Sequence, residues 1–229
     1  VLDACTTYGT MLLWPFSEER IAWNTISIID PLFTLPLLAG VLLAARRKRP
    51  VFAQIAVFWA CSYMALGLWQ RNNAVDMGEA LAASRGHQPM RLEAKPSFAN
   101  ILVWKIVYET PQRYYVDAVR AGLTPRVYPG ESVEKLNIAR DMPWLNLQSQ
   151  QARDIERFRW FSNGYIARDP VFSNRVIDVR YSMIPNEVAP LWSIELKPGA
   201  QLHQHAAYLV HRNAGGNSLS RMWAMVSGG

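Results

Sequence analysis

Two long apolar runs dominate the first third of the chain. Val51–Trp69 holds 19 residues without a charge, and as a helix it would span roughly 28 Å, about the thickness of a bilayer's hydrocarbon core. Pro31–Ala45 holds 15 residues and is extended upstream by three isoleucines between positions 26 and 29. The pattern predicts transmembrane helices at about residues 28–45 and 51–69. The alternative for either run is a helix buried in a protein core.

A short, strongly basic connection joins the two runs. Arg46, Arg47, Lys48 and Arg49 follow one another directly. Cations concentrated between two membrane spans mark the cytoplasmic side. We therefore expect this turn in the cytoplasm and both outer ends of the hairpin in the periplasm of a bacterial inner membrane. The alternative is a basic patch for nucleic acid or lipid headgroups, and its position between two spans favours the topological interpretation.

From Gln70 onward the pattern is that of a water-exposed α+β domain. Residues 71–85 are good helix formers and predict a helix leaving the bilayer. Asn100–Glu109 is nearly continuously apolar, which predicts a strand buried on both faces. A Thr-Pro-Gln turn follows it, and Arg113–Val119 predicts a second strand that completes a hairpin.

The rest of the domain predicts one more helix and three more strands. Pro143 is suited to open a helix, with Asp141 as its candidate cap. Phe161–Asp169 predicts a strand. Arg175–Met183 and Leu191–Lys197 alternate between apolar and polar positions. One packed face and one wet face indicate an antiparallel sheet.

These elements predict a membrane α-helical hairpin followed by an α+β domain with an antiparallel sheet. We place the boundary after Trp69, with residues 1–69 as the membrane part and 70–229 as the extra-membrane, periplasmic domain of about five strands and two helices. Asp178, Arg180 and Ser182 are expected on the wet face of their strand. The Gly- and Ser-rich tail, 215–229, is expected to be frayed.

Composition changes this picture little. The net charge is +6 and the mean hydropathy is −0.03, values that would suit a soluble protein. From residue 70 onward, 19 lysines and arginines face 14 aspartates and glutamates, spread along the segment. Nucleic-acid binding, which needs clustered cations, is therefore not favoured. Both cysteines, Cys5 and Cys61, precede the domain, so a disulfide scaffold is excluded there.

The residues before the first apolar run contain the most specific candidate chemistry. Asp3 lies close to Thr6, Thr7 and Tyr8, and Gly9 suits a turn. A carboxylate near a membrane needs a partner, which can be a cation, a metal ion or the amides of a helix terminus. From these residues alone, a metal ligand and a simple helix cap are equally good interpretations of Asp3.

This N-terminal sequence resembles the YdjM-like, LexA-regulated family of bacterial inner-membrane metal-dependent hydrolases. The residues that carry the resemblance are Asp3, Thr6, Tyr8-Gly9-Thr10, Leu13, Pro15-Phe16-Ser17 and Ile28-Ile29-Asp30-Pro31. Three further stretches, Leu102–Val107, Tyr114-Tyr115 and Trp160–Tyr165, resemble the extra-membrane domain of longer members. The family's aspartate follows a histidine and upstream Asp- and His-bearing motifs. Because this chain begins at Val1 without a methionine, we expect it to be the C-terminal part of a longer member.

The resemblance implies a membrane-bound, metal-dependent hydrolase. Asp3 would be a metal ligand, with zinc the expected ion and the other ligands mostly upstream. Thr6, Thr7, Tyr8 and Asp30 would line the site or support the ligand, although helix capping at the Asp-Pro junction is the favoured interpretation of Asp30. From its location, the substrate is expected to be a phosphoester or a lipid-derived molecule. One carboxylate cannot hold a catalytic metal, so the chain by itself is expected to be inactive.

Other hypotheses remain open at this stage. His203, His205 and His211 suggest a metal site, but no acidic or cysteine partner is apparent nearby, and a solvated surface is the favoured interpretation. Ser162-Asn163-Gly164 indicates a turn, since no glycine precedes the serine as in a nucleophile elbow. The alternative function is a non-catalytic envelope protein whose β-rich domain binds a partner. A soluble binding module would require Val51–Trp69 to be a core helix.

Overall fold

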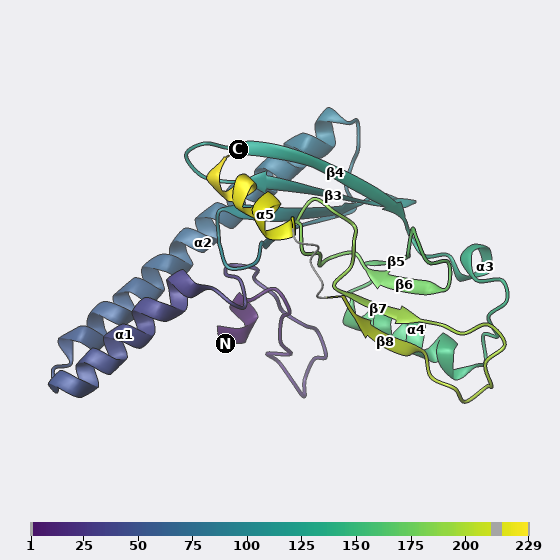
Figure 1. The fold of residues 1–229 in the computed structure, drawn as a ribbon, viewed down its shortest axis with the longest axis horizontal. Coiled ribbons are helices and arrows are strands. Elements are labelled where there is room, and N and C mark those ends of the chain that lie inside the picture. The colour runs from purple at the N-terminus through teal and green to yellow at the C-terminus, as the bar shows by residue number, and fades with distance from the viewer. Residues whose placement is uncertain (1, 212–216, 229) are drawn as a thin grey trace.

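The structure is a computed structural model that describes residues 2–211 and 217–228. A helical hairpin is followed by two four-stranded antiparallel sheets with further helices (Figure 1). This arrangement confirms the predicted fold class, a helical part followed by an α+β part. Residues 212–216, which include part of the tail expected to be frayed, lie outside the described residues.

The hairpin consists of α1 (Pro31–Arg47) and α2 (Val51–Ser84). Asp30 caps α1 by accepting hydrogen bonds from the backbone amides of Leu32 and Phe33, and Pro31 occupies the first turn, where it needs no amide partner. α2 is one continuous helix of 34 residues. It therefore joins the predicted second span and the predicted membrane-leaving helix without a break.

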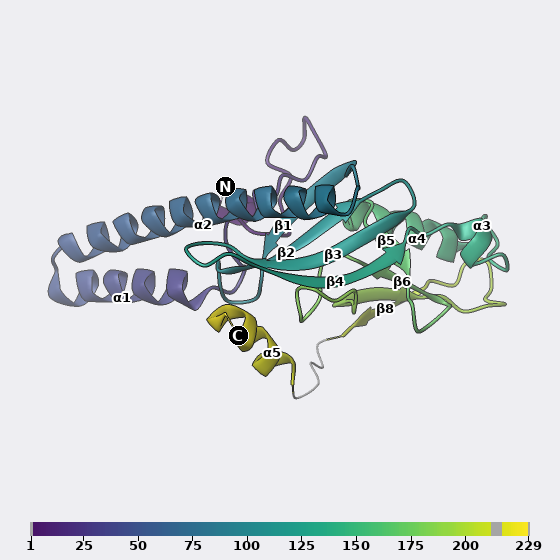
Figure 2. The ribbon, with the colours of Figure 1, turned by 90° about the horizontal axis from the view of Figure 1, so that it is seen from above.

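Most large apolar side chains of the helical hairpin are exposed on the surface of the protein. The two helices run side by side and project away from the sheets (Figure 2). In the apolar 18-residue window of α2 only 17% of the residues are buried. The exposed apolar side chains include Leu35 and Leu42 of α1 and Ile55 and Phe58 of α2. A core helix would be mostly buried, so this exposure contradicts the core-helix alternative for α2 and favours a lipid environment.

The first sheet has the order β1-β2-β3-β4, with every neighbouring pair antiparallel. Its strands are β1 (Arg91–Pro96), β2 (Val103–Glu109), β3 (Arg113–Arg120) and β4 (Arg126–Glu134). β2 and β3 form the predicted hairpin. Every residue of β2 is buried, as expected for its nearly continuous apolar run.

The second sheet has the order β5-β6-β7-β8 and is also antiparallel. Its strands are β5 (Ile166–Arg168), β6 (Arg175–Asp178), β7 (Trp192–Glu195) and β8 (Ala207–Val210). Three clusters of buried side chains define a four-layer arrangement of α2, first sheet, second sheet and α4 (Gln150–Phe161). Trp104 and Ile106 of β2 pack with alanines of α2, whereas Val107 packs with Ile177 of β6.

An ion pair fixes the far end of α2 to the first sheet. The guanidinium of Arg85, the C-cap of α2, donates two hydrogen bonds of 2.7 and 2.8 Å to the carboxylate of Asp117 on β3. Asp117 is fully buried and also accepts from the backbone amide of Gly130 on β4, 2.9 Å away. α2 and the sheet are therefore expected to move as one body.

Several predicted boundaries were wrong. The helix expected to open at Pro143 begins at Gln150, because the hydroxyl of Ser149 caps the amide of Ala152. Asp141 instead belongs to the short α3 (Ile138–Asp141). The strand expected from Phe161 starts only at Ile166, since Phe161 ends α4 and a turn follows.

The predicted wet face of β6 was also wrong. Asp178 and Arg180 are buried and form an ion pair of 2.7 Å, which allows both charges to leave water together. Ser182 is partly exposed and lies beyond the end of the strand. The alternating polar residues therefore do not form a solvent-exposed face. Two of them are a buried ion pair between packed layers of the protein.

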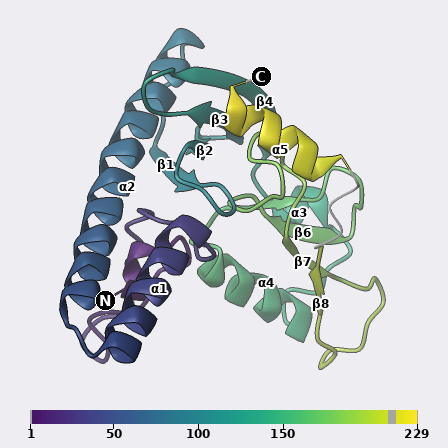
Figure 3. The ribbon, with the colours of Figure 1, turned by 60° about the vertical axis from the view of Figure 1, so that its left-hand side comes forward.

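Three strands and two helices, α3 and the C-terminal helix, were not predicted. β1 and β4 contain a proline or a glycine and many polar residues, so their apolar pattern is weak. β8 lies at the edge of its sheet. In the tail expected to be frayed, residues 218–227 form α5 (Ser218–Ser227), which lies beside β3 and β4 (Figure 3). The carbonyl of Val226 accepts from Arg120, and that of Met225 from Tyr128.

Candidate functional site

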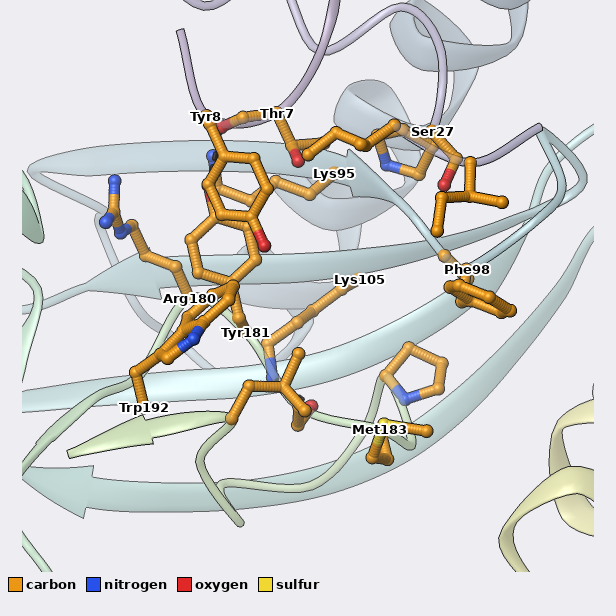
Figure 4. A pocket seen from close by; sticks show the side chains of 17 residues that line it. Thr7, Tyr8, Ser27, Lys95, Phe98, Lys105, Arg180, Tyr181, Met183 and Trp192 are labelled. Carbon is orange, nitrogen blue, oxygen red and sulfur yellow. Dashed lines mark hydrogen bonds between the residues drawn. The ribbon is translucent and has the colours of Figure 1, made fainter. Parts of the chain in front are cut away.

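A cleft of about 400 Å³ lies where the N-terminal segment, residues 2–30, meets both sheets (Figure 4). Thr7, Tyr8 and residues 27–29 of that segment form one wall. The other lining residues come from β1 and the loop after it, from β2, from the loop between β6 and β7, and from the start of β7; they are Lys95, Pro96, Ser97, Phe98, Lys105, Arg180, Tyr181, Ser182, Met183, Pro185, Leu191 and Trp192. Neither the segment nor the domain forms this cleft alone.

Hydrogen bonds hold the N-terminal segment on the domain. The ammonium of Lys95 donates to the amide oxygen of Asn24, 3.3 Å away, and the hydroxyl of Tyr181 donates to the carbonyl of Thr7. The segment also packs closely on α2, since a Cβ added at Gly67 would lie 2.3 Å from the carbonyl oxygen of Thr25. The wall of the cleft is therefore fixed from two sides.

Three buried cations face the cleft. Lys95 pairs with Glu93 at 2.7 Å and Arg180 pairs with Asp178, and neither carboxylate lines the cleft. The third cation, Lys105, is 4% exposed. The three cations thus line the cleft, whereas the two acids that balance Lys95 and Arg180 are not among its lining residues.

Lys105 differs from the other two cations in its partners. Its ammonium nitrogen lies 2.7 Å from the hydroxyl oxygen of Ser182 and 2.9 Å from the carbonyl oxygen of Glu187. In the described part of the chain it forms no ion pair shorter than 4 Å. Burial lowers its pKa from 10.5 to about 7, against the opposing effect of the carboxylates of Asp178, Glu131 and Glu187.

The two ends of the cleft differ in character. At one end the rings of Tyr8, Tyr181 and Trp192 lie against one another, with centroids 5.0 to 5.2 Å apart. Burial raises the pKa of Tyr8, so its hydroxyl stays protonated. At the other end Phe98 and Met183 form an apolar wall, and Lys105 lies between the two ends (Figure 4). Ile29, which also lines the cleft, immediately precedes the Asp30 cap of α1, so the cleft lies next to the start of the helical hairpin.

The structure brings together only some of the residues singled out in the sequence. Thr7 and Tyr8 line the cleft. Asp3 is exposed in a short 3₁₀ helix (Leu2–Cys5), where its carbonyl accepts from the backbone amide and the hydroxyl of Thr6. Asp30 caps α1 and accepts from the hydroxyl of Tyr63. Helix capping, the alternative considered for Asp30, is therefore the role that the structure shows.

The described residues do not fit a metal centre. Among them no group of three or more histidine, cysteine, aspartate or glutamate side chains is placed to hold an ion. The expectation that His205 lacks an acidic neighbour was wrong, because its Nδ1 lies 3.1 Å from Asp154. His211 contacts the hydroxyl of Ser193. Asp3 as a metal ligand stays a prediction, and no chemical step is derived from it.

Comparison with known proteins identifies the first part of the chain. Residues 1–74 match the YdjM inner membrane protein family. The match confirms the family resemblance for this YdjM-like segment, about a third of the chain, and supports a membrane location. The segment ends within α2 and includes Thr7, Tyr8 and residues 27–29 of the cleft. No curated protein and no solved structure matches the chain.

The cations of the cleft were missed in the sequence. Lys105 offered a signal, because it is a charge at the centre of an otherwise apolar strand, and such a charge must have a partner or a function. Arg180 and Ser182 gave no comparable signal, since alternating polar residues look like a solvated strand face. Their proximity to Lys105 depends on how the two sheets stack.

Proposed function

We propose that this chain is a membrane-bound part of a hydrolase and that the cleft binds its substrate, an anionic amphiphile such as a phosphoester or a lipid-derived molecule. The observation that supports this most is the pairing of buried cations with an apolar wall beside the start of α1. A phosphate or carboxylate would bind near Lys95 and Arg180, and a hydrocarbon chain would lie along Ile29 and Phe98.

The position of the cleft supports a substrate that comes from the membrane. The cleft-lining residue Ile29 directly precedes Asp30, where the first helix of the hairpin begins. We further propose two spans in a bacterial inner membrane, with the basic turn, 46–49, in the cytoplasm and the cleft on the periplasmic side. The exposed apolar side chains of both helices and the four cations between them support this topology.

Binding of dodecyl phosphate tests this proposal. The chain in phosphatidylcholine nanodiscs is expected to bind it saturably and more tightly than neutral dodecyl maltoside. Ile29→Glu should weaken binding about tenfold or more, because it removes apolar contact and adds a repelling charge. Leu202→Glu is the matched control, since both side chains are 58% exposed and only Ile29 lines the cleft. Equal losses in both variants, or none in either, would contradict the proposal.

A divalent metal ion remains a separate proposal, derived from the family resemblance. The described residues supply only Asp3, so further ligands would have to come from elsewhere. We expect the chain to retain little zinc after dialysis, and the native full-length protein to retain it in a manner that Asp3→Ala abolishes. Zinc content measured by mass spectrometry of the metal decides this, and an unchanged content in Asp3→Ala would remove Asp3 as a ligand.

A further inference from the structure

One contact in the cleft joins a nucleophile to a base. The Nζ of Lys105 lies 2.7 Å from the Oγ of Ser182, within reach for direct proton transfer. Ser182 comes from the loop after β6 and Lys105 from the middle of β2, so the stacking of the two sheets creates the pair. Ser182 is partly exposed and lines the cleft, whereas Lys105 is buried behind it.

We propose that Ser182 is a nucleophile and Lys105 its general base, and that the pair hydrolyses a carboxylic ester of the amphiphile bound in the cleft. This inference rests on the proposed function and adds the bond that is cleaved. The anionic end of the amphiphile would bind at Lys95 and Arg180, and its hydrocarbon end at Phe98 and Met183. The ester between these two ends would then lie beside Lys105, which lies between the two ends of the cleft (Figure 4).

A lysine can act as a base only when it is neutral. The low pKa of Lys105 leaves roughly half of it unprotonated near pH 7. The carboxylates of Asp178, Glu131 and Glu187 favour its charged form. The other cations of the cleft, Lys95 and Arg180, are paired with Glu93 and Asp178. Burial outweighs the carboxylates, because the residue is enclosed between two sheets.

The hydrogen bonds around the pair suit this exchange. The carbonyl of Glu187, 2.9 Å from Nζ, can keep a neutral amine oriented by accepting one of its two protons. The lone pair of the amine can then receive the hydroxyl proton of Ser182. In the structure this hydroxyl donates to the carbonyl of Ile184, 2.6 Å away, so it has to rotate from that carbonyl to Lys105.

The reaction balances with water as the only co-reactant. Oγ of Ser182 attacks the ester carbonyl carbon, and its proton passes to Nζ of Lys105. The carbon–oxygen bond to the alcohol breaks, and the leaving alkoxide takes the proton from Lys105. Water then attacks the acyl-serine and gives one proton to Lys105, which returns it to Oγ as the acid leaves. The products are one alcohol and one carboxylic acid.

Other serine pairs in the described residues lack one of these properties. Ser193 contacts His211 at 2.8 Å but is fully buried, so a substrate cannot reach it. Ser132 is exposed and lies 3.1 Å from the guanidinium of Arg113, which stays protonated and cannot accept its proton. Ser132 therefore provides a matched control, a hydroxyl beside a cation without a base.

Labelling by a biotinylated alkyl fluorophosphonate tests the pair. The probe reacts when a serine Oγ bonds to phosphorus and fluoride leaves. With the full chain in dodecyl maltoside, mass spectrometry is expected to find the label on Ser182. The labelling rate should rise about tenfold from pH 6 to pH 8 and level off as Lys105 becomes neutral. Ser182→Ala should abolish the label and Ser132→Ala should leave it unchanged.

Two lysine variants separate a base from a merely structural residue. Lys105→Met should lower the labelling rate about 100-fold and remove its pH dependence. Lys105→Arg, which keeps the charge but cannot release its proton, should be equally slow. Each variant must still bind dodecyl phosphate, which shows an intact cleft. Absence of label on Ser182 while the phosphate binds overturns the pair and leaves the proposed function standing; loss of phosphate binding by the unmodified chain overturns the proposed function itself.

Discussion

Lys105→Met should make the protein more stable below pH 7 and almost remove the dependence of its stability on pH between 7 and 10. The unfolded chain keeps the lysine proton up to a pKa of about 10.5, whereas the folded chain releases it near 7. The unfolded state therefore binds more protons in this window, and the unfolding free energy of the unmodified protein rises with pH across it. The full difference is on the order of 5 kcal/mol, and it acts against the folded state below pH 7.

Denaturant unfolding of the full chain in neutral detergent, followed by tryptophan fluorescence at several pH values, measures this effect. Lys197→Met is the control, because Lys197 is exposed and its removal should leave the pH profile unchanged. A parallel pH dependence in the unmodified protein and in Lys105→Met would show that Lys105 keeps its proton in the fold. The base proposed for Ser182 would then be lost as well.

Gly67→Ala should separate the N-terminal segment from α2 and lower the affinity of the cleft for dodecyl phosphate about tenfold or more. The added Cβ would lie 2.3 Å from the carbonyl oxygen of Thr25 and 3.7 Å from the side chain of Ile26, and backbone atoms at the first distance must move. The cleft wall at residues 27–29 follows directly in the chain. The first sheet packs on a later part of α2 and should keep its structure.

Helix propensity makes this variant informative, because alanine favours a helix over glycine by about 1 kcal/mol. Any loss of affinity for dodecyl phosphate in Gly67→Ala must therefore come from the contact with Thr25. Ala65→Val adds more volume two residues earlier, on the exposed side of the same helix, and should leave binding unchanged. Hydrogen exchange of residues 2–27 should rise in Gly67→Ala alone. Unchanged exchange together with unchanged affinity would sink this interpretation of the contact.

The sequence predicted those elements that consist of a nearly continuous run of apolar residues. The two runs of the helical hairpin and most of β2 are apolar, because residues that face lipid and residues packed on both sides have the same requirement. The β-hairpin of β2 and β3 was also predicted from the Thr-Pro-Gln turn that joins the two strands. β1 and β4 escaped prediction because they use prolines, glycines and paired charges, which local pattern alone cannot distinguish from a loop.

The candidate site was predicted only on its N-terminal wall. Thr7 and Tyr8 were predicted as site residues from the sequence motif around Asp3, and both line the cleft. The contact between Lys105 and Ser182 joins residues 77 positions apart in the chain. Such a contact depends on which face of one sheet meets the other, and a single sequence contains no direct record of this. The buried pair of Asp178 and Arg180 shows the same limit, since opposite charges in a polar pattern resemble a solvated surface.

If α2 spans the membrane as proposed, its unbroken course would couple the cleft to the bilayer. Its 34 residues extend about 50 Å, of which roughly 30 Å match the hydrocarbon core, so the remainder acts as a lever on which the first sheet is mounted. Transmembrane helices adjust their tilt to bilayer thickness, and a tilt of about 10° displaces a point roughly 20 Å above the interface by some 3 Å. In the proposed topology, a thinner or thicker membrane would therefore change the height of the cleft relative to the lipid headgroups.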